Sequence, residues 1–283
     1  MKRFMIGMLL LICGWSIQAQ TNSKSLLWKI ERNDIQTSYL YGTIHLIPQG
    51  AFEINEKVTE VFNTAEQIVL EIDMDDPKMQ MKMMQNAMMK DETTLDQLFS
   101  EEDYRAVSNA LKETMGVGLE AVNKMKPFVI SSMLITNLIE GTPASFEMSF
   151  VQMAKAKELE ILGLETIEYQ MSIFDKIPYQ EQAKDVVDMV RNEEASREEF
   201  AAMVKAYREE DIDGLYEIIE SYADTTTEME ELLVKRNQNW IPAIGELTKE
   251  KVSFIGVGAG HLGGEQGVIN LLKEAGYTVT PMK

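Results

Sequence analysis

Short apolar runs rich in β-favouring residues alternate with long amphipathic stretches along this chain. A short run bounded by polar residues is typical of a buried strand. The runs that predict strands lie at 28–31, 37–41, 68–73, 160–165, 252–255 and 277–280. The turn-prone pair Asn33-Asp34 joins the first two, which predicts a hairpin. The last two flank a helix expected at 266–275 and ended by Gly276, and this segment predicts a βαβ unit.

Helical periodicity dominates the stretches between these runs. Helices are expected over 55–64, across 77–142, over 144–157 and from 179 to 247. The clearest signal is at 100–115, where Ser100 and Asp103 form a capping box and Gly116 stops the helix. Strands that alternate with such helices are typical of an α/β fold.

The order of these elements predicts a central, largely parallel sheet built from segments that lie far apart in the sequence. Two large helical insertions, at about 77–157 and 179–247, are expected to cover the edge where the strands end. No fixed-period repeat or low-complexity linker divides the chain. We therefore expect residues 20–283 to form a single domain.

Charge and rare residues limit the possible functions. The chain of 283 residues has 46 Asp and Glu against 27 Lys and Arg, a net charge of −19. This excess of carboxylates repels phosphate backbones, so we expect no nucleic-acid partner. A single cysteine excludes a disulfide framework, an iron–sulfur cluster and a cysteine-ligated zinc site. Histidine chemistry must use His45, His261 or both.

The first residues follow the pattern of a secretory signal peptide. Lys2 and Arg3 precede an apolar run at 4–15, and Ala19 offers a small residue for cleavage. The run is too short to cross a bilayer, so we expect no stable membrane span in the mature chain. The protein is expected to be exported, periplasmic or secreted, with residues 1–19 removed. The alternative is a lipoprotein anchored through Cys13.

Ionisable residues follow four of the expected strands. They are His45, Glu71 with Asp73 two residues further on, Glu165 and His261. The carboxyl ends of parallel strands meet at one edge, which is where open α/β sheets bind ligands. We therefore expect the two histidines and these carboxylates to converge on one crevice.

Both histidines stand in the same local frame, Gly-Xaa-Xaa-His, at 42–45 and 258–261. A glycine there allows a positive φ or a close backbone approach as the chain leaves the strand. Gly258, Gly260 and Gly263 also match GxGxxG. No acidic residue closes the next strand to bind a ribose, so we expect no nucleotide cofactor.

Five ordered blocks resemble the TraB/GumN family, which includes the Tiki proteases and is more distantly related to the erythromycin-esterase and ChaN proteins. The resemblance runs from Leu27 nearly to the C-terminus. The blocks are LYGTIH at 40–45, IVLEID at 68–73, GLET at 163–166, KRN at 235–237 and GVGAGHLGG at 256–264. Many relatives also carry Gly-Xaa-Asp before the middle helix. This chain has TPASFE at 142–147 instead, which leaves the role of Glu147 open.

The resemblance implies a metal-dependent hydrolase, with His45, His261 and Glu71 at the reactive centre. Tiki members cleave peptides with manganese or cobalt, and zinc also suits two imidazoles and a carboxylate. A metal ion held by His45, Glu71 and His261 would lower the pKa of a bound water and polarise a carbonyl. Glu165 or Asp73 could act as general base or orient a ligand.

Arg236 and Asn237 lie in one of the matching blocks. Arg236 could stabilise an oxyanion or bind a substrate carboxylate, and its alternative role is a surface ion pair. The expected function is therefore exported, metal-dependent hydrolysis, with a peptide bond as the expected target. Two alternatives stay open: a metal-free hydrolase that uses His45 with Glu71, and a binding or sequestering protein for a peptide or small ligand. The oligomeric state is left undecided.

Methionines gather next to one of these blocks. Seven of the 20 methionines lie between Met74 and Met89. Helical spacing divides these methionines between two sides of one helix, so they form no single tight cluster. This favours a packing or lid helix over a copper(I) site built from thioethers. An adaptable peptide-binding surface is the third interpretation.

Overall fold

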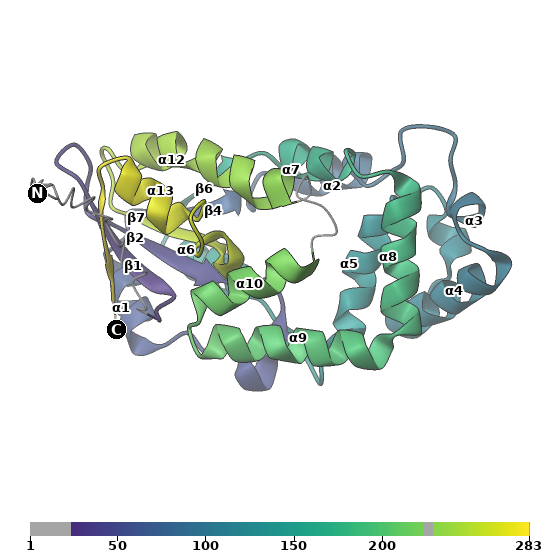
Figure 1. The fold of residues 1–283 in the computed structure, drawn as a ribbon. Coiled ribbons are helices and arrows are strands. Elements are labelled where there is room, and N and C mark those ends of the chain that lie inside the picture. The colour runs from purple at the N-terminus through teal and green to yellow at the C-terminus, as the bar shows by residue number, and fades with distance from the viewer. Residues whose placement is uncertain (1–23, 223–228, 283) are drawn as a thin grey trace, which may run out of the picture.

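A computed structural model of the protein describes residues 24–222 and 229–282. The expected signal peptide and Cys13 lie outside these residues. A six-stranded sheet with the order β6-β4-β7-β2-β1-β8 forms the centre of the fold (Figure 1). Its strands are β1 (Leu27–Glu31), β2 (Ser38–Thr43), β4 (Gln67–Ile72), β6 (Glu160–Glu165), β7 (Ser253–Gly258) and β8 (Thr278–Pro281).

The sheet is mostly parallel, as the sequence predicts. β2, β4, β6 and β7 pair in parallel, whereas β1 pairs antiparallel with both β2 and β8. β8 therefore runs in the same direction as β7, and α13 (Val268–Glu274) completes the expected βαβ connection between them. β1 and β2 form the expected hairpin. The carboxyl ends of β2, β4, β6 and β7 consequently lie at one edge.

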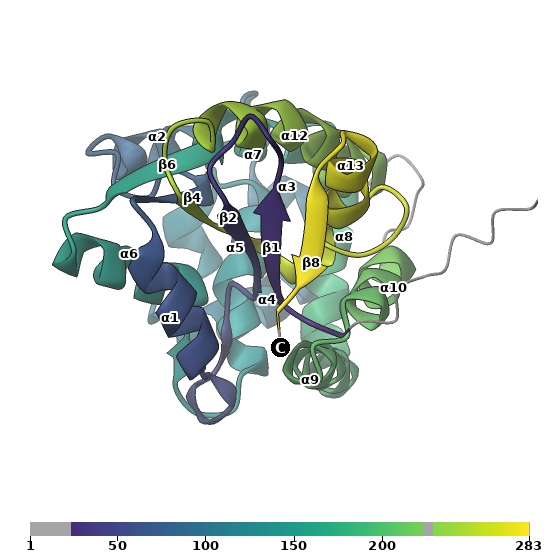
Figure 2. The same ribbon diagram turned by 90° about the vertical axis from the view of Figure 1, so that its left-hand side faces the viewer.

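Helices cover both faces of the sheet (Figures 1 and 2). α1 (Glu56–Thr64) and α6 (Phe146–Ala156) lie on one face, and α12 (Lys235–Leu247) and α13 lie on the other. Phe254 of β7 contacts Phe62 of α1 and Phe150 of α6, with ring centroids 5.1 and 4.8 Å apart. Strands that are buried on both faces have nearly continuous apolar sequences, and this explains the runs in β4 and β7.

The two helical insertions contact each other and build a second apolar cluster, away from the sheet (Figure 1). The helices that meet there are α3 (Leu95–Leu98), α4 (Glu101–Met115), α5 (Pro127–Leu134) and α8 (Tyr179–Arg191). Leu111, Ile130 and Val186 are buried in this cluster. α9 (Glu193–Arg208) and α10 (Ile212–Tyr222) then return the chain to the sheet, where Tyr207 joins the main core.

Capping residues define several helix ends. At the start of α4, Ser100 Oγ accepts from the Asp103 N–H at 3.1 Å, and Gly116 ends the helix with a φ of 73°, as expected. The helix expected at 144–157 begins later, at Phe146. The difference arises because the two-residue strand β5 (Pro143–Ala144) pairs with β3 (Ile47–Pro48) and Ser145 caps α6.

The Met-rich segment forms α2 (Met79–Asn86), which packs against α7 (Ile167–Phe174). Met79 contacts the small apolar cluster of Ile167 and Met171, whereas Met81, Met83 and Met84 are exposed.

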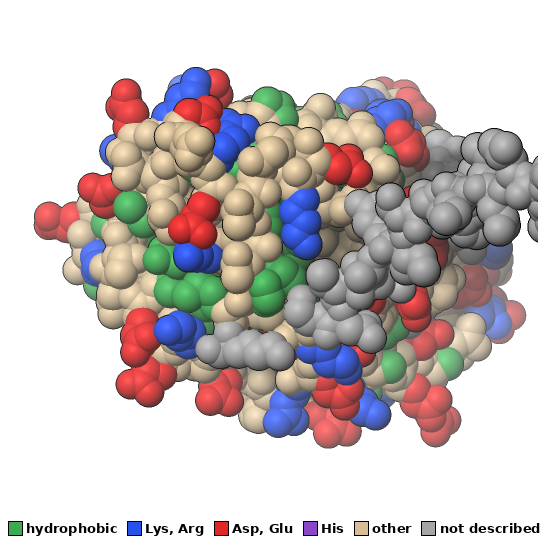
Figure 3. Space-filling view, turned by 60° about the vertical axis from the view of Figure 1, so that its left-hand side comes forward, with side chains coloured by type: hydrophobic (Ala, Val, Ile, Leu, Met, Phe, Trp, Pro, Cys, Tyr) green, Lys and Arg blue, Asp and Glu red, His purple; other side chains and the backbone are tan. Residues whose placement is uncertain are grey.

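On the face drawn in Figure 3, Lys and Arg side chains are scattered among Asp and Glu side chains. Within residues 24–222 and 229–282, no helix is both long and apolar enough to cross a bilayer.

Candidate functional site

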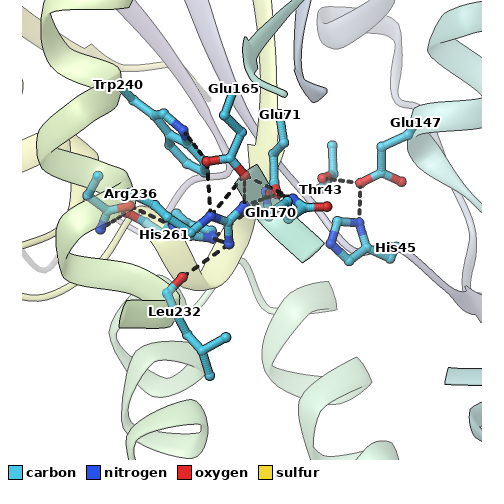
Figure 4. Close-up of polar contacts among 12 residues, drawn as sticks. Thr43, His45, Glu71, Glu147, Glu165, Gln170, Leu232, Arg236, Trp240 and His261 are labelled. Carbon is cyan, nitrogen blue, oxygen red and sulfur yellow. Dashed lines mark hydrogen bonds and ion pairs between the residues drawn. The ribbon is translucent and has the colours of Figure 1, made fainter. Parts of the chain in front are cut away.

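The carboxyl ends of the four parallel strands bring together four of the expected site residues (Figure 4). Glu71 lies in β4 and Glu165 ends β6. His45 follows β2, and His261 follows β7 in a short 3-10 turn. Arg236 reaches the same place from α12 and contacts three of them. The expected convergence of two histidines and two carboxylates is therefore present.

Arg236 is the buried cation of this cluster, with only 8% of its side chain exposed. Its Nη2 donates to Glu71 Oε2 at 2.5 Å and to Glu165 Oε1 at 2.8 Å. Nε donates to Glu165 Oε1 at 3.0 Å, and Nη1 donates to the Leu232 carbonyl and to His261 Nε2, each at 3.1 Å. A guanidinium has five N–H groups, and here all five have acceptors within the protein.

Glu71 is held as a carboxylate by donors on both of its oxygens. Oε1 accepts from the Gly258 N–H at 2.8 Å, and Oε2 accepts from Arg236 and from Gln170 Nε2, the latter at 3.0 Å. Burial opposes ionisation, but the Arg236 charge, the two histidines and the Gly258 N–H together outweigh it and lower the pKa of Glu71 to about 2. Gln170 also donates to Glu165 Oε1 at 3.1 Å and so joins the two acids.

His261 is a buried, neutral imidazole with a defined tautomer. Asn237 donates through Nδ2 to the Gln266 carbonyl, so its Oδ1 faces His261 Nδ1 at 2.6 Å and accepts the Nδ1 proton. Nε2 then accepts from Arg236. Burial, and after it the Arg236 charge, lower the pKa of His261 to about 3. Trp240 packs against the imidazole with ring centroids 4.5 Å apart.

His45 lies on the opposite, solvent-facing side of the cluster, with 70% of its side chain exposed. Its Nδ1 is 2.8 Å from Oε1 of Glu147, a carboxylate in the first turn of α6. The same oxygen accepts from Thr43 Oγ1 at 2.6 Å, and Oε2 accepts from Ser145 Oγ at 3.0 Å. The hydrogen bond to Glu147 raises the pKa of His45 from 6.5 to about 9.

Two cavities meet at His45 and Glu71. The first, of about 270 Å³, extends toward Ser145, Glu147 and Gln170. The second, of about 180 Å³, extends the other way, past His261 to side chains from α9 and α10. A molecule that occupied both cavities would therefore lie beside His45 and Glu71.

The donor set at His45, Glu71 and His261 does not fit a divalent metal ion in this arrangement. His261 Nε2 and Glu71 Oε2 are already hydrogen-bonded to the Arg236 guanidinium. A second cation beside Arg236 would also be repelled by it. Across the described part of the chain, no group of three or more His, Cys, Asp or Glu residues is arranged to hold a metal ion.

The structure adds residues that the sequence did not assign. Glu147, whose role the sequence left open, is the partner of His45, and Asn237 is the partner of His261. Gln170 had no motif signal. Asp73, an expected acid, instead accepts the backbone N–H of Asp75 in a local turn.

The glycines before the histidines have neighbouring side chains packed closely against them. A Cβ on Gly42 would lie 2.7 Å from Leu262 Cδ1, and one on Gly258 would lie 3.2 Å from Glu71 Oε1. Neither glycine has a positive φ. Both frames therefore show a close approach of side chains to the backbone, and the positive-φ alternative is wrong.

The comparisons with known proteins give a family and no individual relative. None of the curated proteins and none of the solved structures matches the chain. The model of the TraB/PrgY/gumN family matches residues 26–281, which include every site residue described above. The chain therefore belongs to the TraB/PrgY/gumN family.

Proposed function

We propose that this protein is a hydrolase that uses His45 as its acid–base group. One observation carries the proposal: an exposed imidazole, held by a buried carboxylate, lies where two cavities meet. General acid–base catalysis needs a titratable group that is both oriented and accessible to substrate. His45 meets both requirements, whereas His261 is buried and bonded on both ring nitrogens.

Glu147 sets the chemistry of His45. When the imidazolium loses one proton, the Nδ1 proton stays in the hydrogen bond to Glu147, and Nε2 carries the lone pair. Nε2 takes a proton from water as the water oxygen attacks the substrate carbonyl carbon. The imidazolium then returns that proton to the leaving nitrogen or oxygen as the bond breaks. Because its pKa lies above 7, only a minority of His45 is in the base form at neutral pH.

Glu71 and Arg236 support this step without exchanging protons. The Glu71 carboxylate lines both cavities, and its charge favours the imidazolium that forms on His45. Arg236 keeps Glu71 ionised and fixed in position. Since all five of its N–H groups have protein acceptors, Arg236 acts as a positioning residue rather than as the expected oxyanion or carboxylate ligand.

A peptide bond is the proposed target, and the resemblance to the Tiki proteases supports it. Export is also part of the proposal, because residues 1–19 have the pattern of a signal peptide. The helical insertions act as a cover over the strand-end edge. Met203 and Tyr207 of α9 and Leu215 and Ile219 of α10 support this role, since they line the second cavity opposite the sheet.

Metal-dependent hydrolysis, which the resemblance implies, is the second candidate. His261 Nε2 and Glu71 Oε1, which are 4.0 Å apart, would hold the ion, and the ion would activate a bound water. A metal ion could bind His261 only if Arg236 first released it. In the structure, Arg236 Nη1 stays hydrogen-bonded to His261 Nε2. Retention of activity after complete metal removal would distinguish the Arg236-based site from a metal site.

The test is cleavage of a peptide library by the purified protein, followed by mass spectrometry, with and without a chelator. We expect cleavage in both conditions, and we expect His45→Gln to lose about 10²- to 10⁴-fold of the rate. Arg105→Gln, an exposed substitution on α4, is the matched control and keeps the rate. Equal cleavage by His45→Gln would contradict the proposal. Saturable peptide binding without product would instead favour the binding or sequestering alternative.

A further inference from the structure

The second cavity has two chemically different walls. Thr43, His45, Glu71 and His261 form a polar wall at the sheet edge. The opposite wall, which we call the apolar wall, comes from helices and consists of Met203, Tyr207, Leu215, Ile219 and Leu233. A cavity that places reactive polar groups against an apolar surface is suited to a substrate with an apolar group beside its reacting bond.

Packing against the glycine-rich loop fixes the position of the apolar wall. A Cβ on Gly260 would lie 2.0 Å from Ile219 Cδ1, and a Cβ on Gly263 would lie 2.6 Å from the Ile212 carbonyl oxygen. Because the Ile212 carbonyl is backbone and cannot move aside, helix α10 can approach the loop this closely only where residue 263 is glycine. The GxGxxG match, which the sequence excluded as a nucleotide site, thus has a packing role that shapes the cavity.

Tyr207 contributes its ring to this wall while its polar end is satisfied elsewhere. Its hydroxyl donates to the Gly42 carbonyl at 2.9 Å and lies 3.4 Å from the Tyr41 hydroxyl. Burial raises the pKa of Tyr207 well above its usual value, so the hydroxyl stays protonated and uncharged. The helical side of the cavity therefore carries no ionised group among its lining residues.

Size and charge restrict what this cavity can accept. Its volume of about 180 Å³ exceeds the roughly 150 Å³ at which an apolar protein cavity holds a benzene ring. An isobutyl or phenyl group fits this volume. A charged group would lose its hydration against the apolar wall.

We propose that the second cavity is an apolar specificity subsite for a leucine- or phenylalanine-sized side chain next to the scissile bond. This inference rests on the proposed hydrolase function and names its substrate class. Ile219 is the specificity-determining residue, because it forms part of the apolar wall and touches the loop that leads to His261. The subsite would favour cleavage beside large apolar residues over cleavage beside glycine or aspartate.

The first arm of the experiment measures kcat/KM for matched peptides with leucine, phenylalanine, tryptophan, glycine or aspartate at each position flanking the cleaved bond. We expect leucine or phenylalanine to exceed glycine by about tenfold or more at one position. Ile219→Trp fills the cavity and reduces that ratio to about one, whereas Ile219→Ala enlarges it and raises the relative rate for tryptophan. Glu217→Trp, on the exposed side of the same helix, is the control and keeps the wild-type ratio.

The second arm measures binding without turnover. It therefore tests the subsite proposal separately from the hydrolase proposal. N-acetyl-leucinamide, N-acetyl-glycinamide and N-acetyl-aspartamide are titrated into the protein and followed by NMR. Binding of the leucine compound alone, lost in Ile219→Trp but kept in Glu217→Trp, supports the subsite even where no peptide is cleaved. Equal binding of all three compounds overturns the subsite, and so does cleavage with no preference. Peptide cleavage would still support the hydrolase.

Discussion

Replacing Glu147 by glutamine removes the charge that holds His45 while leaving most of the local hydrogen bonds possible. The glutamine carbonyl oxygen can accept from His45 Nδ1 and from the Thr43 hydroxyl, as Glu147 Oε1 does. Its amide group then faces Ser145 Oγ, which can rotate to accept. The tautomer of His45 is kept, so the substitution tests electrostatics rather than orientation.

The expected size of the effect follows from the contact between His45 and Glu147. The two side chains are 2.8 Å apart, and the bond raises the pKa of His45 from 6.5 to about 9. Because 70% of the His45 side chain is exposed, water screens the pair, and we expect the apparent pKa to lie between these two values. Glu147→Gln should return it toward 6.5, a fall of about one pH unit or more.

Histidine NMR measures this directly, since the chain has only two histidines. In tag-free protein, the His45 signal should titrate above pH 6.5, and the His261 signal, with its pKa lowered to about 3, should stay constant from about pH 5 upward. The acid limb of kcat/KM against pH should have the same midpoint as His45 and should move down with it in Glu147→Gln.

Glu140→Gln, which removes an exposed carboxylate outside this contact, is the control and should leave the midpoint in place. A wild-type midpoint at 6.5, or one that Glu147→Gln does not move, would refute the assignment of Glu147 as the partner of His45. A titrating His261 would refute the neutral, Arg236-bound imidazole.

Three further predictions concern stability. Arg236→Met leaves buried carboxylates unpaired and should lower the free energy of unfolding, measured in urea, by about 3–5 kcal/mol. The control Arg105→Met removes an exposed arginine and should lower it by no more than about 1 kcal/mol. Equal losses in the two variants would contradict a buried ion-pair network. Gly263→Ala should lower the free energy of unfolding by about 1–3 kcal/mol, because its Cβ would lie 2.6 Å from the Ile212 carbonyl oxygen, whereas Gly50→Ala meets no atom within 4 Å and should cost much less; no difference between the two variants would exclude this backbone contact. The pKa of Glu71 is 4.5 in the unfolded chain and about 2 in the folded protein. Its ionisation therefore adds roughly 3 kcal/mol to the free energy of unfolding above pH 4.5, and this contribution is lost as the pH falls toward 2. In Glu71→Gln, the free energy of unfolding should depend less on pH over this range.

The parallel sheet and the gathering of polar residues at one of its edges were predictable because local signals specify them. Short apolar runs that end in polar residues define strands, and the geometry of parallel strands then brings His45, Glu71, Glu165 and His261 to one edge. The hairpin, the βαβ unit and the Ser100 cap depend on residues close together in sequence, and the structure contains all three.

The partners of the two histidines were harder to predict, for different reasons. Glu147 lies 102 residues after His45, and only the packing of α6 against the sheet brings the two together. Asn237 and Arg236 lie within a block that matches the family, but the directions of their side chains depend on how α12 packs over the sheet. No sequence pattern shows that Arg236 uses all five of its N–H groups. Because of that saturation, we propose a positioning role for Arg236 instead of the expected substrate ligand; the ion-pair alternative holds in that Arg236 pairs with Glu71 and Glu165, but the pairs are buried and not at the surface.

The most direct test of the central claim is peptide hydrolysis by wild-type protein and by His45→Gln, each stripped of metal and assayed with chelator present. The account predicts that stripped wild-type protein cleaves peptides and that stripped His45→Gln is about 10²- to 10⁴-fold slower. Activity that disappears on stripping and returns with manganese, cobalt or zinc would contradict the Arg236-based site. Undiminished cleavage by His45→Gln would contradict His45 as the acid–base group.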